Sequence, residues 1–368
     1  MNGLWSAEGR SKLHPDFSKV LEMQEAERNN MCEVGNREEN RETKTKTPLS
    51  RMQTFVLETF ENNYHILNQL CSSCGIEFYR QPDLAAGIVG AVFHGLRLVP
   101  DYRLRVINRF VKTLVNKCPS ACYSAVLAPV LQSFLPYMYE RMGERWKYLA
   151  ALRESPSFDE DNADSQEVMD DVVCRHLARE FLDALKAVLT SGGGSDIPLA
   201  NFTKGNNGAG NGGPGGTDSN NGEAANENKS GAATNGNGGG GRGEQVKVSE
   251  LGKLVLAHET LGQGVVLILV ESIQWPDSLS SIRASTLLEL VLPPLVAAGR
   301  LSDADASRVY YSILRALHEL GRHEGNYIAL VQLAIMAYET MRPRHPCVVD
   351  VLAQVRKDRL TVQLNSLV

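Results

Sequence analysis

Apolar side chains recur along most of this chain at the spacing of an amphipathic helix. Between residues 302 and 320 they fall at i, i+3, i+4, i+7, i+11 and i+14, which is one face of a helix. Similar stripes of 15–25 residues alternate with short polar or proline-containing breaks, and strand-like alternation is nearly absent. The pattern predicts an all-α protein. Helices are expected at 15–32, 48–72, 82–97, 102–117, 120–152 with a break near Pro136, 165–190, 246–272, 278–298, 302–320, 324–341 and 346–357.

Local signals predict where some of these helices begin and end. Ser302 with Asp305 three residues later is a capping pattern for the helix at 302–320. Asp277 opens 278–298 in the same way, and Gly299 closes it, because glycine accepts the left-handed conformation common after a helix.

The spacing of the helices points to a repeat. Those near 82, 102 and 120, and again those near 278, 302 and 324, begin 18–25 residues apart. Two successive helices then make a unit of 40–47 residues, which is the period of HEAT-type arrays. Such pairs stack into an α-solenoid with a long binding face. A compact helical bundle remains the alternative.

Two polar segments divide the helical regions. Residues 191–243 contain 18 of the 32 glycines and ten asparagines, which predicts a disordered linker. Residues 154–171 carry eight acidic side chains and no basic one, which predicts an acidic loop. We expect HEAT-like repeats at 48–190 and 244–360, and a partly disordered segment with one helix at 1–47.

Composition narrows the class of protein. The 368 residues are 43% hydrophobic with a net charge of −5, and no run of about 18 uncharged apolar residues occurs. That pattern argues against a membrane span, and the N-terminus lacks the apolar core of a signal peptide. Seven cysteines, an odd number in a long chain, indicate reduced thiols.

Candidate catalytic and metal-binding patterns are weak. His318 and His323 are five residues apart, whereas the zinc-protease helix needs four to put both on one face. Cys71 with Cys74, and Cys118 with Cys122, could supply four thiolates, but the second spacing does not suit a zinc knuckle and small buried thiols are the better interpretation. We expect no enzyme activity, no metal and no cofactor.

Clusters of basic residues form the candidate binding surfaces. Arg105, Arg109 and Lys112 fall at i, i+4 and i+7, with Arg103 near the start of the same helix, while Val106, Phe110, Val111 and Leu114 form the opposite face. They form either an ordinary solvated face or a contact for an anionic partner. A second cluster, with the same two interpretations, comprises Arg342, Arg344, Arg356, Lys357 and Arg359. Aromatic residues do not interleave with these bases, so an RNA ligand would be a duplex contacted through its phosphates.

Short segments along the chain carry a family resemblance. They are Leu49-Ser50-Arg51-Met52-Gln53, Ile76-Glu77-Phe78-Tyr79, Pro100-Asp101-Tyr102-Arg103-Leu104-Arg105, Cys118-Pro119, Leu127-Ala128-Pro129-Val130-Leu131, Asp164-Ser165-Gln166-Glu167, Leu251-Gly252-Lys253, His258-Glu259 and Met341-Arg342-Pro343-Arg344. In this order and spacing, over about 49–345, they resemble the C-terminal region of the exportin-5 family of karyopherin-β nuclear export receptors.

The resemblance implies a right-handed HEAT solenoid that shuttles between nucleus and cytoplasm. Such a receptor binds Ran-GTP together with cargo, which is hairpin RNA such as microRNA precursors, or in some settings tRNA or protein, and it meets nucleoporins in transit without entering a membrane. No catalytic residue is implied. Members of the family are several times longer, and the repeats that form the main Ran arch have no counterpart here. A helical scaffold that binds a protein partner and has lost transport is the second hypothesis. The RNA-contact prediction for Arg103, Arg105, Arg109 and Lys112 rests on charge and helix spacing alone.

Overall fold

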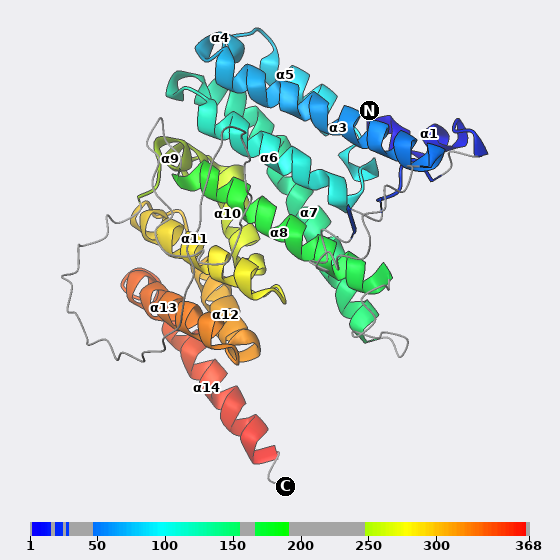
Figure 1. Cartoon of the computed structure of the whole chain (residues 1–368). Helices are drawn as coiled ribbons and strands as arrows, with labels where there is room; N and C mark the ends of the chain where they lie inside the picture. Colours follow the sequence, from blue (N-terminus) through cyan, green and yellow to red (C-terminus); the bar gives the residue numbers. More distant parts are fainter. Residues whose placement is uncertain are drawn as a thin grey trace, which may run out of the picture. The chain divides into compact units, whose positions relative to one another are not determined.

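The computed structural model describes residues 2–15, 19–24, 27–28, 47–154, 166–190 and 247–365. Within these ranges every regular element is helical and no strand occurs, so the all-α prediction is confirmed. The α-helices are α1 (Ala7–Ser11), α3 (Pro48–Ser73), α4 (Ile76–Tyr79), α5 (Leu84–Ile88), α6 (Asp101–Lys117), α7 (Ala128–Arg153), α8 (Gln166–Thr190), α9 (Glu250–Ala257), α10 (Glu259–Ser272), α11 (Ser278–Ala297), α12 (Asp303–Leu320), α13 (Glu324–Met341) and α14 (Cys347–Asn365) (Figure 1).

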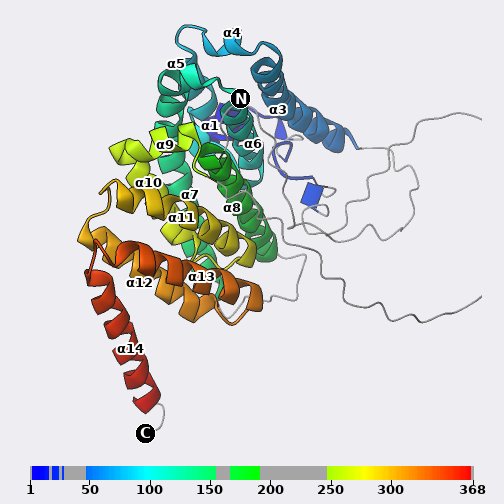
Figure 2. The ribbon, with the colours of Figure 1, turned by 90° about the vertical axis from the view of Figure 1, so that its left-hand side faces the viewer.

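The longer helices pack in two rows. In the first row α3 contacts α6, α6 contacts α8, α8 contacts α11, and α11 contacts α13. The second row runs in the same way through α5, α7, α10, α12 and α14. Partners from the two rows, α7 with α8, α10 with α11 and α12 with α13, are consecutive in the chain and touch each other (Figures 1 and 2). Consecutive pairs stacked in chain order form the predicted α-solenoid.

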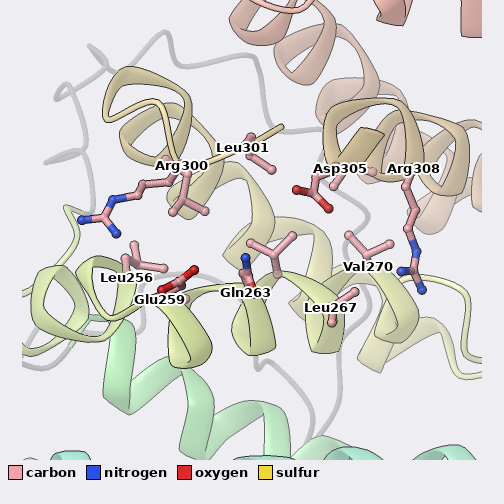
Figure 3. Close-up of a pocket in the computed structure, with 13 residues that line it drawn as sticks. Leu256, Glu259, Gln263, Leu267, Val270, Arg300, Leu301, Asp305 and Arg308 are labelled. Atoms are coloured by element: carbon pink, nitrogen blue, oxygen red, sulfur yellow. The ribbon is translucent and has the colours of Figure 1, made fainter. Parts of the chain in front are cut away.

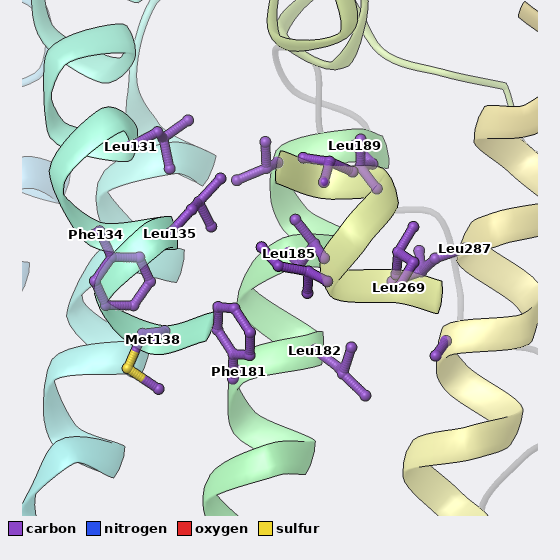
Figure 4. Packing of buried hydrophobic residues seen from close by; sticks show 14 of the residues in the cluster. Leu131, Phe134, Leu135, Met138, Phe181, Leu182, Leu185, Leu189, Leu269 and Leu287 are labelled. Carbon is purple, nitrogen blue, oxygen red and sulfur yellow. The ribbon is translucent and has the colours of Figure 1, made fainter. Parts of the chain in front are cut away.

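The hydrophobic core lies between the rows. Phe134 of α7 is 1% exposed, and its ring lies edge-on to that of Phe181 in α8 with centroids 6.2 Å apart. Leucines of α7, α8, α10 and α11 fill the same layer, as Figure 4 shows (Figure 4). The i, i+3, i+4 spacing therefore buries one stripe of each helix against the other row.

The predicted helix ends are confirmed in detail. The Asp277 side chain accepts a hydrogen bond from the Ser280 backbone N–H, and Ser302 with Asp305 forms a reciprocal capping box. Gly299 has φ +65°, and its N–H donates to the Val296 carbonyl at 3.1 Å. The next N–H, that of Arg300, donates to the Leu295 carbonyl at 3.0 Å. This pair of bonds is a Schellman turn that ends α11.

Two helix predictions had the wrong break. The region 246–272 is not one helix, because α9 and α10 meet at His258 with a bend of 103°. Gly262 permits this bend because it has no Cβ: a Cβ at that position would lie only 2.8 Å from the Leu256 carbonyl oxygen. The break expected near Pro136 does not occur, and α7 runs through that residue. Its exposed position explains the tolerance, because the carbonyl that loses its helical partner can meet water.

Smaller differences concern irregular turns. The 120–152 stretch opens with a 3₁₀ turn and a π-helical turn before α7, and 82–97 ends in the same two kinds of turn after α5. Residues 19–24 form turns, so the helix predicted at 15–32 is wrong there. The rest of that helix lies mostly outside the described residues. The Gly/Asn-rich linker also lies outside them, as does 155–165 of the acidic loop, but 166–171 belongs to α8 and is not a loop.

Helix α11 tests the sequence argument about membranes. By length and composition alone it could cross a bilayer, and so could the bent pairs 101–117 with 120–153 and α9 with α10 if each were one span. In the structure, 56% of the apolar window of α11 is buried by neighbouring helices. Arg283 within α11 also lies 3.2 Å from Asp183 of α8. Helix α11 packs between α8 and α13, which accounts for its apolar sequence.

Candidate nucleic-acid interface

Helix α6 holds the basic residues singled out by sequence, and it lies in the first row between α3 and α8. As predicted, Phe110, Val111 and Leu114 are fully buried, whereas Val106 is only partly buried. Burial of that stripe directs the remaining side chains of α6 toward its neighbours in the row and toward solvent.

Arg103 does not belong to an open basic face. Its side chain is 6% exposed, and the guanidinium donates to both carboxylate oxygens of Glu27 at 2.5 and 3.0 Å. The neighbouring Tyr102 hydroxyl donates to the Leu21 carbonyl at 2.9 Å. Together these contacts hold part of the N-terminal segment against α6, so Arg103 has a structural role.

Arg109 is more accessible but already paired. Its Nε and Nη2 donate to Oε1 of Glu180 in α8 at 3.1 and 2.8 Å, while its side chain is 55% exposed. A phosphate at this position would compete with the Glu180 carboxylate. The pair also links two helices of the first row.

Arg105 and Lys112 are the two cations of this face that form no ion pair with a described residue. Both are partly buried. Burial, followed by the nearby positive charge of Arg109, lowers the pKa of Arg105, and no described group bonds to its buried Nε. The carboxylates of Glu180, Glu27 and Glu61 act in the opposite direction but do not outweigh these two effects on the positive charge of Arg105. A bound anion would stabilise it.

The sequence analysis did not predict the carboxylates that pair with the arginines of α6. Glu27 and Glu180 lie 76 and 71 residues away from the arginines they bind. Further pairs follow along the first row, with Arg179 bound to Asp277 and Arg283 near Asp183. Several arginines of the first row are thus already paired with carboxylates of a neighbouring helix.

The second basic cluster is also partly structural. Arg344 donates to the carbonyls of Val296 and Ala297 at the end of α11, and the Arg342 guanidinium lies 5.8 Å from the centre of the Tyr338 ring. Arg356 is exposed, and the side chain of Arg359 is outside the described residues. This cluster therefore offers fewer free charges than its sequence indicates.

The cysteines form a buried group rather than an open site. Burial raises the pKa of Cys71 to about 11 and that of Cys118 to about 12, so both thiols are neutral near pH 7. Cys74 is exposed, apart from these buried thiols. In the part of the chain that the structure describes, no three His, Cys, Asp or Glu side chains gather in a way that could hold a metal ion.

The comparison with known proteins decides the family. The Exportin-5 family model matches residues 1–360 of the 368. The chain belongs to the Exportin-5 family. It is 30% identical over 368 residues to exportin-5 of Mus musculus and 29% identical to that of Homo sapiens. Each alignment covers 98% of this chain and 28% of the relative. Exportin-5 of Dictyostelium discoideum is 20% identical over 191 residues, which is 52% of this chain and 16% of that protein.

Membership in the Exportin-5 family indicates the class of protein to which this chain belongs. The family is one of transport receptors and not of enzymes. The chain spans about a quarter of the length of its mammalian relatives. The resemblance inferred from short motifs is therefore confirmed at the level of the family, and cargo and partners are matters for proposal.

Proposed function

We propose that this protein acts in nuclear export as a carrier of structured RNA, above all microRNA precursor hairpins, with tRNA and proteins as further cargo. The match of the Exportin-5 family to residues 1–360 carries the proposal. The two-row helical array is the kind of surface such a receptor uses. Cargo would bind together with Ran-GTP and be released after GTP hydrolysis in the cytoplasm, with nucleoporins contacted in transit.

The mechanism requires binding energy and no catalytic group. Ran-GTP and cargo each raise the affinity of the other when both favour the same conformation of the array. Within this chain we assign the RNA contact to α6, where Arg105 and Lys112 make no ion pair with a described carboxylate. Contact with phosphates would suit duplex RNA, whose shape and backbone are read more readily than its bases.

Filter binding with a hairpin RNA that carries a short 3′ overhang tests the proposal. The protein immunopurified from nuclear extract should bind this RNA more tightly with Ran loaded with a non-hydrolysable GTP analogue than with Ran-GDP. Affinity that does not depend on Ran, or no binding at all, would leave the scaffold hypothesis in its place.

A charge reversal tests the role of α6 separately. Arg105→Glu combined with Lys112→Glu should weaken hairpin binding and reduce the slope of log K against log salt by roughly 2, since each lost phosphate contact removes about one unit. Arg315→Glu provides the control, because Arg315 is an exposed α12 residue paired with Glu319. An unchanged slope in the double variant would show that α6 is a solvated surface.

A further inference from the structure

A cavity of about 200 Å³ lies between α10 and α12, neighbours in the second row (Figure 3). We call it the α10–α12 cavity. Its floor is apolar and is formed by side chains of the helices α9, α10, α11 and α12 and of the turn between α11 and α12: Leu256, Val266, Val270, Leu295, Leu301 and Val309. Each of these side chains is mostly buried, yet no described side chain fills the space they surround. The cavity is made of residues that play no part in the α6 surface.

The walls of the cavity are held by backbone structure. The Schellman turn at Gly299 fixes the backbone of Arg300, and the capping box at Ser302 fixes the first turn of α12. On the opposite wall, Gly262 lets the end of α9 fold closely onto α10. Such walls need little ordering when a ligand binds, which favours affinity.

Two exposed arginines lie at the rim of the cavity. Arg300 and Arg308 are exposed, and neither forms an ion pair with any residue that the structure describes. Figure 3 shows them at opposite ends of the cavity, with the apolar side chains between them (Figure 3). The nearby Asp305 is already engaged, because its carboxylate accepts from the Ser302 hydroxyl at 2.6 Å and from the Ser302 N–H at 3.3 Å.

We propose that the α10–α12 cavity binds a segment of a partner protein that inserts one bulky apolar side chain and carries acidic residues on both sides of it. The volume suits a leucine, methionine or phenylalanine side chain, whose burial supplies most of the affinity. The flanking acids pair with Arg300 and Arg308. This binding needs neither RNA nor Ran, so it does not depend on the export proposal.

The rim distinguishes a peptide from a nucleic acid. The carboxylates of Glu259 and Asp305 also line the cavity. They would repel a phosphate backbone, which has one negative charge at every nucleotide. A peptide can place single acids opposite the two arginines and leave the carboxylates in water. The apolar floor likewise gains nothing from phosphate or ribose.

Fluorescence polarisation with the full chain and labelled synthetic peptides tests this proposal. The probe has the one-letter sequence EDSLFSDE, and the matched peptides are KKSLFSKK and EDSAASDE. We expect the probe to bind at least about tenfold more tightly than either matched peptide, because one buried apolar side chain or one charge-assisted pair changes Kd by about that factor or more.

Protein variants locate the binding. Gln263→Trp should block the cavity from its exposed rim, and Arg300→Glu with Arg308→Glu should reverse its charge, each weakening the probe at least tenfold. Arg322→Glu with Arg356→Glu makes the same charge change at exposed positions that do not line the cavity and should leave Kd unchanged. Circular dichroism confirms that each variant is folded.

Four results would overturn the proposal. They are no saturable binding of EDSLFSDE up to about 1 mM, equal binding of KKSLFSKK, an affinity unchanged by both cavity variants, or a loss of hairpin RNA affinity without a loss of peptide affinity in Arg300→Glu with Arg308→Glu. Sedimentation of the full chain adds a fifth, because self-association abolished by Gln263→Trp would identify a second copy as the occupant.

Discussion

Asp277 stabilises two elements from one buried position, and its replacement by alanine should be costly. Its side chain is 2% exposed and accepts from Arg179 Nε and Nη2 at 3.0 and 2.6 Å. The same carboxylate caps α11, accepting from the Ser280 N–H at 3.0 Å and the Ser280 hydroxyl at 2.6 Å. Asp277→Ala removes the helix cap and one of the polar links between α11 and α8 together.

The magnitude follows from these two losses. Loss of an N-cap costs about 1 kcal/mol. A broken ion pair leaves Arg179 without this carboxylate, but its side chain is 27% exposed, so water limits the cost to about 2 kcal/mol. We therefore expect Asp277→Ala to reduce the free energy of unfolding by about 3 kcal/mol.

Urea unfolding followed by tryptophan fluorescence measures this change. Trp275 lies two residues before Asp277 and packs against Trp146 with ring centroids 6.0 Å apart, so the signal reports on this region. Glu319→Ala is the control, since it breaks an exposed pair with Arg315 and should cost less than about 1 kcal/mol. A loss below about 1 kcal/mol for Asp277→Ala would refute the reasoning, as would a double-mutant cycle with Arg179→Ala that shows no coupling.

The pH dependence provides a second check on the same residue. Burial alone would raise the pKa of Asp277, but hydrogen bonds from Arg179 and Ser280 outweigh it and hold the pKa below its ordinary value. A lowered pKa in the folded state means that the unfolded state binds the proton more readily. The stabilisation is therefore complete above the ordinary aspartate pKa and is lost as pH falls through the folded value. Asp277→Asn should show a smaller loss of stability between pH 6 and pH 3 than the unaltered chain.

Three further predictions concern other parts of the array. Gly262→Ala should lower the free energy of unfolding by roughly 2 kcal/mol in chemical denaturation, because its Cβ would meet a backbone carbonyl of α9. Gly264→Ala is the control: its Cβ meets nothing within 4 Å, so it should raise that free energy by about 0.5 kcal/mol or more. Equal effects of the two substitutions would contradict the role of close approach at Gly262. With a thiol reagent at pH 8, exposed Cys74 should react rapidly and the buried thiols only on unfolding, as mass spectrometry of the labelled peptides would show. Glu27→Ala should cost about 2 kcal/mol and speed proteolysis before α3, because it strands its arginine partner in α6; an unchanged cleavage rate would argue against a structural pair.

Sequence patterns predicted the fold where local chemistry decides it. Ser302, Asp277 and Gly299 act on backbone groups within a few residues, so their signals survive without tertiary information. The bend at His258 was missed because no proline or glycine stands at the bend itself, and the close approach that requires Gly262 shows only in the structure. At Pro136 the sequence predicted a break that does not occur, because the exposed position of this proline lets α7 continue.

The sequence singled out the basic residues of the candidate surface but not the carboxylates that pair with them. Helical spacing predicted one basic surface on α6, but Arg103 is buried, whereas the apolar face of that helix was largely as expected. Spacing within one helix cannot show that Glu27 and Glu180 neutralise Arg103 and Arg109, because those carboxylates come from distant segments. Likewise, no sequence pattern predicted the α10–α12 cavity, which forms only where α9, α10, α11 and α12 meet.

The end of α8 and the start of α9 are held together by direct backbone contact. The Ser249 N–H donates to the Leu189 carbonyl at 2.9 Å, and a Cβ at Gly252 would lie 2.7 Å from that same oxygen. Residues 189 and 249 thus lie side by side in the structure, although they are far apart in the sequence. Doubling the length of a flexible segment between two fixed points costs only about 0.6 kcal/mol in closure entropy. An epitope tag or a fluorescent protein inserted there should leave the helical stack intact, which makes this junction the natural place to label the protein in cells.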